Sequence, residues 1–461
     1  MSSPQVGARF VAGLGDMLVQ RQALIRRLQW IMIVAYVFLL TVPLLLPLPT
    51  NADFIWSNLT RFAQFVFWGI WWPFVVLGTA LVGRFWCGLL CPEGALSEFA
   101  SERRAGRAIP SWMKWSGWPA VSFVSTTVYG QLTSIYQYPK PAALLLGGST
   151  FAAMAIGARY GKTKRVWCRF LCPVSGVFGL VGKLAPLHFR VEPEAWRRNS
   201  DHPVRHKAGV NCAPLVPIKT MQGASACHMC GRCSSHRGAI RLAWRKPASD
   251  IVHGSGRTAT WWDTVLIVPV LLGLVPAALN WSNSGVFQVT RQWLVEACVN
   301  QHWMSPLSLR LPWWILTNYP AASDVMTIVD AAALILVIAA STVLASCMFL
   351  VPLAFSSVIL RRRFYVLHHL AQALIPIAAA SLFCGLLSLT IGQLRSDGIM
   401  IPYVDLLRAA TVSAAGAWSV ALSFRVGGLY QQLLWRQLAA SALFALPTVA
   451  FLVGWVAVLL K

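Results

Sequence analysis

Seven of the eleven cysteines stand at spacings typical of metal ligands. Four of them form two C-x-x-x-C-P pairs, each preceded by Arg-x-Trp: Cys87 with Cys91, and Cys168 with Cys172. The ten-residue strings 83–92 and 164–173 share six identical positions, so this region reads as an internal repeat. Thiolates are soft ligands, and two pairs supply the four that an iron–sulfur cluster or a zinc ion takes. The duplication therefore predicts one four-thiolate centre shared by both repeats, with buried structural thiols as the alternative.

The spacing within each pair also predicts local geometry. Residues four apart on a helix lie on one face. Proline after the second cysteine disfavours helix at that cysteine. We therefore expect the chain to bend there, so that both thiols of a pair point at one centre. The arginine before each pair is expected to lower the pKa of the thiols.

A third motif, Cys227-x-x-Cys230-x-x-Cys233, lies in a long polar segment. This spacing is the first three-quarters of the bacterial [4Fe–4S] run. Its short intervals bring three thiolates around one cluster, and Gly231 permits the tight turn. The motif predicts a second cluster, with a structural zinc ion as the alternative.

The fourth ligand of this second centre is open from the sequence. Arg237 occupies the position at which the run would place its last cysteine. Cys212, upstream in an Asn-Cys-Ala-Pro string, is the best spare thiol, and His228 and His236 are substitutes. With Cys212, the chain has eight thiolates for two four-thiolate centres, which we predict to be [4Fe–4S] clusters.

The elements that position these cysteines are membrane helices. Of the 461 residues, 57% are apolar and only 12% charged, and the mean hydropathy is +0.59. Soluble domains carry about 25% charged residues, so a cytosolic globular enzyme, a secreted disulfide module and a disordered tail are excluded. We predict an all-α polytopic membrane protein of about nine transmembrane helices. Their ranges are 30–48, 62–83, 117–136, 141–158, 262–280, 325–353, 366–390, 403–423 and 437–460.

The net charge of +24 is explained by the positive-inside rule. Of the 39 Lys and Arg residues, 32 fall in 1–29, 84–115, 159–260, 361–363 and 425–436, which alternation places on one side. We therefore predict a bacterial-type inner membrane protein with its N-terminus and cysteine motifs in the cytoplasm, where thiols stay reduced. Nucleic acid is not needed to explain the charge.

Three regions follow from this topology: an N-terminal membrane region (1–183) with the repeats, a cytoplasmic iron–sulfur segment (184–260) and a C-terminal membrane region (261–461). The middle segment is short for a domain with its own core, so we expect a metal centre to order it. In the C-terminal region, His368 and His369 follow Arg361–Arg363 and are weak candidates for binding haem or a quinone. An interfacial histidine beside snorkelling arginines is the alternative.

These motifs resemble the membrane-bound polyferredoxin family, the NapH-, MauN-, NosR- and CcoG-like 4Fe-4S binding proteins. The resemblance covers about 62–245 and implies electron transfer between the quinone pool, or a cytoplasmic donor, and a partner redox protein such as a respiratory complex. The chain departs from the family pattern in three ways. Its loop has one cluster run instead of two, it has no flavin-attachment region, and it ends in four extra spans instead of a sandwich domain.

Our first functional hypothesis is therefore a membrane-bound iron–sulfur electron carrier, a component of electron transfer more than a stand-alone enzyme. The second is a metal-handling assembly factor that binds or reduces copper or iron for a respiratory enzyme, because soft thiolates also suit Cu(I). The third is a structural zinc membrane protein with no redox role.

Overall fold

The computed structural model describes residues 4–50, 52–102, 106–198, 210–221, 223–360 and 364–459. They form two compact units. Unit 1 consists of residues 1–38, 74–119 and 148–258, and unit 2 of residues 39–73, 120–147 and 259–461. These units are defined by compactness. They do not test the region boundaries expected at 183 and 260, which remain a prediction. Arg361–Arg363 lie outside the described residues.

Unit 1 is made of helices and one small antiparallel sheet, of strands β1 (Leu187–Val191) and β2 (Ile240–Trp244). Helices α2 and α4 continue a few residues into unit 2. The helices are α1 (Pro4–Gln20), α2 (Gln22–Thr41), α4 (Trp72–Val82), α5 (Phe85–Leu89), α6 (Pro92–Ser101), α9 (Gly148–Ile156), α10 (Val166–Phe170), α11 (Ser175–Val181), α12 (Pro193–Arg198) and α13 (Ser255–Thr258).

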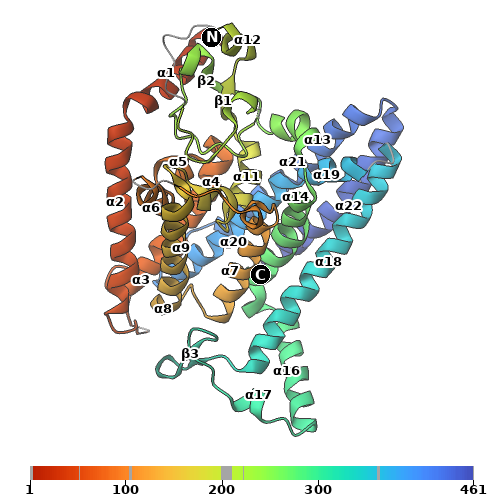
Figure 1. Cartoon of the computed structure of the whole chain (residues 1–461). Coiled ribbons are helices and arrows are strands. Elements are labelled where there is room, and N and C mark those ends of the chain that lie inside the picture. Colours follow the sequence, from red (N-terminus) through yellow and green to blue (C-terminus); the bar gives the residue numbers. More distant parts are fainter. Residues whose placement is uncertain are drawn as a thin grey trace. The chain divides into compact units, whose positions relative to one another are not determined.

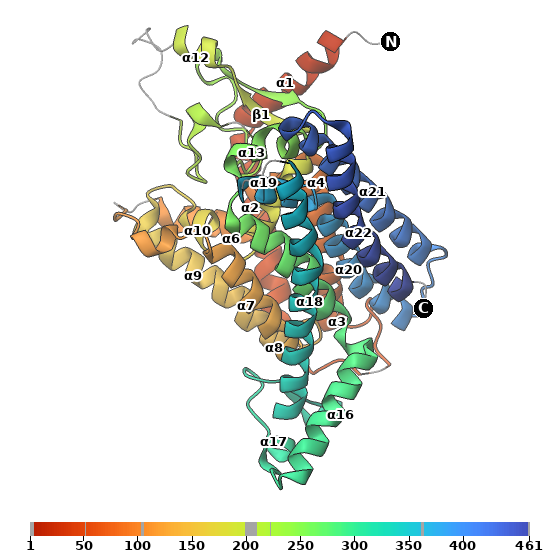
Figure 2. The ribbon, with the colours of Figure 1, turned by 90° about the vertical axis from the view of Figure 1, so that its right-hand side faces the viewer.

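Helix α1 completes the core of the polar segment (Figure 1 and Figure 2). Its Val11, Leu14 and Leu18 pack against a buried cluster that includes Phe189, Leu242 and Cys227. At Gly15 the approach is so close that a Cβ would stand 2.8 Å from Ser234 Oγ and 3.0 Å from Leu242 Cβ. The hydroxyls of Ser234 and Ser235 both donate hydrogen bonds to Asp16 (2.9 and 2.5 Å). Helix α1 thus contributes apolar side chains to the core of the segment 184–260. This contribution was not expected from the sequence.

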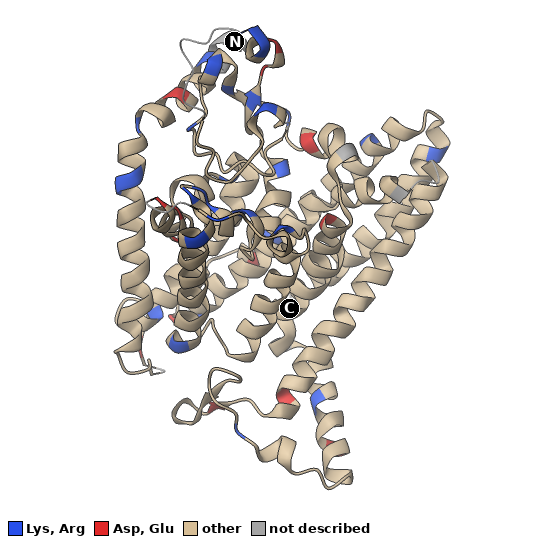
Figure 3. Ribbon diagram, in the orientation of Figure 1, with Lys and Arg blue, Asp and Glu red and all other residues tan. Residues whose placement is uncertain are grey.

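Unit 2 holds most of the long apolar helices and a short strand pair, β3 (Asn318–Tyr319) with β4 (Asp324–Val325). Figure 3 shows that α18 carries almost no charged residue along its length, whereas Lys and Arg gather on unit 1. The helices of unit 2 are α3 (Leu59–Gln64), α7 (Trp118–Leu132), α8 (Pro139–Ala142), α14 (Trp261–Val265), α15 (Val275–Asn280), α16 (Gly285–Asn300), α17 (Ser305–Ser308), α18 (Ile328–Leu360), α19 (Phe364–Gln372), α20 (Ile375–Ser396), α21 (Val404–Tyr430) and α22 (Leu434–Leu459).

Eight helical segments of the described residues are long and apolar enough to cross a membrane, which confirms an all-α, multi-pass membrane protein. They are Gln22–Leu44, Leu59–Val82, Pro139–Gly161, Trp261–Asn280, Ile328–Leu360, Ile375–Ser396, Val404–Tyr430 and Leu434–Leu459. In three of them, π-helical turns join shorter α-helices into one span: Phe65–Trp71, Ala143–Gly147 and Leu266–Leu274.

Eight of the nine expected spans correspond to these segments. The ninth, 117–136, coincides with α7, which has 15 residues and is shorter than the other candidates. The expected span 366–390 is divided: α19 ends at Gln372, and α20 begins at Ile375 with a proline in its first turn. Proline lacks the backbone N–H that a continuous helix would need, so it favours a new helix start at this point.

Candidate iron–sulfur site

The two copies of the repeated motif adopt the same backbone. Each forms a five-residue helix, α5 and α10, that ends before the second cysteine. The amides of Leu90 and Cys91 both donate to the carbonyl of Trp86 (3.0 and 2.9 Å). The amides of Leu171 and Cys172 donate in the same way to Trp167 (both 2.9 Å). The sequence repeat is therefore also a structural repeat.

This geometry confirms the bend at the second cysteine, but the two cysteines of a pair do not share one helix face. We expected both cysteines of a pair on one helix face, yet the helix stops at Leu89, and Cys91 is extended (φ −62°, ψ 118°). Pro92 then begins α6. The proline excludes helical geometry at the residue before it, so the second thiol leaves the helix and the chain turns around it.

The four thiols of the repeats lie close enough to affect one another's ionisation. Burial raises the pKa of Cys91 and Cys172, and neighbouring thiols of the same set raise both values further. Burial raises the pKa of Cys168 to about 12, with Cys87 among the groups that add to the rise. The structure thus brings together the four cysteines that the repeat predicts as one set.

The prediction that arginine lowers the pKa of these thiols is only partly confirmed. Arg165 does act to lower the pKa of Cys168, but burial outweighs it and the net shift is upward. Taking a thiolate out of water costs more than one nearby guanidinium returns. A positively charged centre bound to these sulfurs would hold them as thiolates.

The loop thiols form the second set, and Cys212 lies near it. Burial raises the pKa of Cys227 to about 12, and Cys230 and Cys212 raise it further. The pKa of Cys233 is also raised, by burial and then by the other three thiols of the set. Cys212, the spare thiol expected from the sequence, is therefore near all the others.

The loop is wound tightly around these thiols. Met229 and Gly231 both have positive φ (54° and 75°), which confirms the turn expected at Gly231. The amide of Met229 donates to Cys227 Sγ (3.4 Å). Hydrogen bonds to ligand sulfur are one of the protein's means of setting a cluster's reduction potential.

The two thiol sets are neighbours within unit 1. Gly88, between the cysteines of the first pair, lies so near the loop that a Cβ would stand 2.0 Å from the His228 carbonyl oxygen. Arg165, at the second pair, donates its backbone amide to Ala213 O (2.8 Å), next to Cys212, and its Nη1 to Cys87 O. The sequence placed all eight cysteines on one side of the membrane, but it gave no sign of this contact.

The residues around the thiols fit iron–sulfur clusters. Arg84 Nε, Arg165 Nη2 and His228 Nδ1 are buried nitrogen atoms with no hydrogen-bond partner among the described residues. Such atoms are costly unless an acceptor reaches them, and cluster or thiolate sulfur would be one. In the described part of the chain, no three His, Cys, Asp or Glu side chains converge as a site for a single metal ion. A cluster binds each thiolate at a different corner, so its ligands stand farther apart than those around one zinc ion.

A buried charge network, which the sequence analysis missed, links the two sets. Glu98 on α6 accepts a hydrogen bond from Arg165 Nε (2.8 Å) and two from Arg232 (2.5 and 3.1 Å). Burial opposes the Glu98 charge, but the two guanidinium groups outweigh it and lower the pKa of Glu98. Arg165 precedes Cys168 by three residues, and Arg232 precedes Cys233 by one. In the sequence, the only sign of this network is an acidic residue, Glu98, seven residues after Cys91.

His368 and His369 lie in unit 2, on α19, and both are buried. His368 Nδ1 is 2.8 Å from Thr264 Oγ1, and His369 Nδ1 is 2.7 Å from Tyr430 Oη. Each histidine therefore has a hydroxyl partner, which suits helix packing. A role in binding haem or a quinone stays a prediction.

Comparisons with known proteins agree with this site. A family model described as a 4Fe-4S binding domain matches the chain twice, over residues 64–110 and 146–192, and each match contains one copy of the repeated motif. Fold and site together thus define a multi-pass membrane protein with 4Fe-4S binding domains. The chain is similar to YccM of Escherichia coli (strain K12), provisionally named an electron transport protein.

The similarity to YccM is distant: 22% identity over 245 residues, which are 47% of this chain and 65% of YccM. No solved structure matches the chain. The matches support iron–sulfur electron transfer by a membrane protein, and they name neither donor nor acceptor.

Proposed function

We propose that this protein is a membrane-bound electron carrier that passes electrons between the quinone pool, or a cytoplasmic donor, and a partner redox protein. One observation supports this most: seven thiols from three separate motifs, together with Cys212, gather in unit 1 as two neighbouring sets of four. Two adjacent redox centres form a short path for electrons, whereas a structural metal site needs only one.

In this proposal, two [4Fe–4S] clusters have defined ligands. Cys87, Cys91, Cys168 and Cys172 hold the first, and Cys212, Cys227, Cys230 and Cys233 hold the second. The clusters would supply one-electron chemistry, and the chain's own residues would set the potentials through burial, the Met229 N–H and the surrounding arginines.

We also propose that both clusters face the cytoplasm of a bacterium, at its inner membrane. The spans Leu59–Val82 and Pro139–Gly161 each lead directly into a copy of the motif, and the copies contact each other through Arg165 and Cys87. Two spans that end on the same side require the chain between them to cross back. Helix α7, about 22 Å long at the usual helical rise, is the element that lies between them, and with the turn after it would nearly span the apolar core.

Iron and acid-labile sulfide per chain test the proposal, measured on anaerobically purified protein together with electron paramagnetic resonance after dithionite. We expect about eight of each, as two four-iron clusters require, and signals from reduced clusters. About four of each would remove one of the two proposed clusters. Stoichiometric zinc without iron would refute electron transfer altogether.

Single cysteine variants test the ligand sets. Cys230→Ser should lose the loop cluster and Cys87→Ser or Cys168→Ser the other, with the same phenotype for both, because the repeats share one centre. Cys347→Ser is the matched control, since Cys347 is exposed, lies on α18 in unit 2 and belongs to neither set. Full iron and sulfide in Cys230→Ser would show that the loop assignment is wrong.

A further inference from the structure

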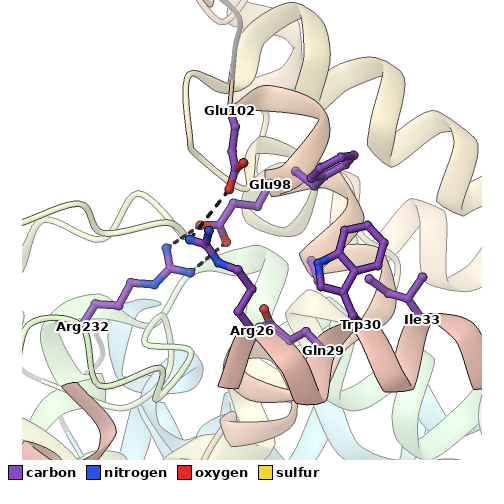
Figure 4. A pocket seen from close by; sticks show the side chains of 9 residues that line it. Arg26, Gln29, Trp30, Ile33, Glu98, Glu102 and Arg232 are labelled. Atoms are coloured by element: carbon purple, nitrogen blue, oxygen red, sulfur yellow. Dashed lines mark hydrogen bonds and ion pairs between the residues drawn. The ribbon is translucent and has the colours of Figure 1, made fainter. Parts of the chain in front are cut away.

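A cavity of about 120 Å³ opens in unit 1 between α2 and α6 (Figure 4). Its volume is comparable with the ~150 Å³ of an engineered apolar cavity that admits a benzene ring. At its mouth, Arg26 and Glu102 approach to 3.9 Å with side chains 70% and 40% exposed, so the cavity is accessible from outside. A single six-membered ring would fit this space.

One side of the cavity is apolar and lies at the start of a membrane span. Trp30 and Phe99 pack edge to face with ring centroids 5.2 Å apart, and Ile33 continues the wall. Trp30 and Ile33 belong to the span Gln22–Leu44. Beyond them on α2, Val34 and Phe38 are exposed, as side chains that face lipid would be. An apolar tail attached to a ring in the cavity could therefore lie along α2 in the bilayer.

The other side of the cavity is polar and offers both donors and acceptors. The carboxylates of Glu98 and Glu102 accept hydrogen bonds, while Arg26, Gln29 and Arg232 donate them. Figure 4 shows the charged side chains of α2, α6 and the loop reaching toward one another at this end. A lining with equal numbers of Arg and Glu does not select an anion such as a phospholipid phosphate. It suits a neutral ring whose oxygens are carbonyls in one redox state and hydroxyls in the other.

The same residues contact both thiol sets. Gln29 Nε2 donates to Gly88 O (3.3 Å), between Cys87 and Cys91. Arg232 is the residue before Cys233 and is joined to Glu98 by two hydrogen bonds. A ring in this cavity would therefore be separated from the backbone of the first thiol set by the side chain of Gln29, and from that of the second by the side chain of Arg232.

We propose that this cavity binds the head group of a membrane quinone or quinol, with its carbonyls or hydroxyls toward Glu98, Glu102 and the arginines and its ring against Trp30 and Phe99. The inference rests on the proposed electron-transfer function, since it makes the quinone pool the redox partner on the membrane side.

Binding of a fluorescent quinol analogue tests this site without relying on activity. The full-length protein in detergent is titrated with an alkyl hydroxyquinoline N-oxide, whose fluorescence is quenched when it binds. We expect saturable binding, weakened about tenfold by Trp30→Ala or by Phe99→Ala, because each removes an aromatic wall. Glu102→Gln should weaken binding severalfold, since it removes a charged acceptor at the mouth.

Phe151→Ala is the matched control, because Phe151 is an exposed phenylalanine of unit 1 that does not line the cavity. Its affinity should equal that of the wild type. Pocket variants that bind the analogue like the wild type would overturn the proposal. So would displacement of the analogue by phosphatidylglycerol alone, which would identify a site for lipid head groups.

Iron and sulfide are measured on the same samples to separate the two proposals. Wild-type protein with both clusters and no analogue binding would refute the quinone site and leave the electron-transfer proposal intact. Analogue binding that depends on Trp30 in protein without iron would refute the clusters and retain the site.

Discussion

Arg165 should raise the reduction potential of both clusters, and its removal should lower both. Arg165 is 1% exposed, its Nη1 donates to the carbonyl of Cys87, and its backbone amide donates to the carbonyl of Ala213 beside Cys212. A reduced cluster carries one more negative charge than an oxidised one, so a fixed positive charge nearby favours reduction. Arg165→Met removes that charge and nothing that ligates iron.

The expected size follows from these contacts. For the distance from the Arg165 guanidinium, which binds the carbonyl of Cys87, to the centre of a cluster held by that cysteine, we take about 8 Å. At an effective dielectric constant of about 20, one unit charge at that distance contributes about 2 kcal/mol, or about 90 mV for a one-electron couple. Glu98 binds the far side of the Arg165 guanidinium; taking about 12 Å for its distance to the cluster, Glu98→Gln should raise the potentials by about 60 mV.

Redox titration monitored by electron paramagnetic resonance measures these shifts in each cluster. Arg165→Lys is the charge-retaining control and should stay near the wild-type values. The double variant Arg165→Met/Glu98→Gln removes one charge of each sign, so its potentials should return most of the way toward the wild type. Iron and sulfide content confirm that each variant retains both clusters.

The directions in which Arg165→Met and Glu98→Gln shift the reduction potentials test the electrostatic reasoning. If Arg165→Met and Glu98→Gln move the potentials in the same direction, the changes come from altered structure and the electrostatic reasoning is wrong. A shift confined to one cluster would mean that Arg165 does not lie between the two.

Three further predictions concern packing. Gly88→Ala should cause loss of the loop cluster, because the new Cβ would stand 2.0 Å from the His228 carbonyl oxygen. The control Gly148→Ala, whose Cβ would have nothing within 4 Å, should keep full iron content. Equal iron content in the two variants would contradict the contact between Gly88 and the loop. Asp16→Ala removes the acceptor of two serine hydroxyls and should destabilise the docking of α1 by about 1–3 kcal/mol, seen as faster proteolysis of the N-terminus; unchanged proteolysis would count against that docking. Tyr430→Phe removes the partner of His369 and should lower the melting temperature slightly with both cluster signals unchanged, so a changed cluster signal would refute a purely structural role for this pair.

The sequence predicted the parts of the site whose signal is local. The repeated R-x-W-C-x-x-x-C-P string predicted a structural repeat, because cysteine spacing, tryptophan and proline act within one turn of helix. Gly231 was expected at a turn for the same reason, and its φ of 75° agrees. Eight of the nine spans followed from apolar runs, since the length of such a run is set by the thickness of the bilayer.

The contacts that assemble the site were beyond the sequence because they join distant positions. Glu98 and Arg232 are 134 residues apart, and nothing near either one marks its partner. The docking of α1 was missed for a related reason: Val11, Leu14 and Leu18 form an apolar face, but the strands that it covers lie more than 160 residues away. Helix α7 shows the limit for spans, since Ser, Thr and Gln dilute its apolar run.

The arginines of this chain fall into two groups, exposed and buried, and the two need different explanations. Exposed arginines outside the spans fit the positive-inside rule, which concerns charge in contact with water and lipid head groups. Arg84 and Arg165 do not fit it, because they are 5% and 1% exposed. Buried charges persist when an opposite charge compensates them, and Glu98 already has two guanidinium partners in Arg165 and Arg232. Arg84 donates to Ser225 O (2.9 Å) but has no ion pair with a described carboxylate. In our proposal, thiolate-bound clusters supply the missing negative charge. The repeated arginine of the motif would then take part in the chemistry of the site as well as in the membrane topology.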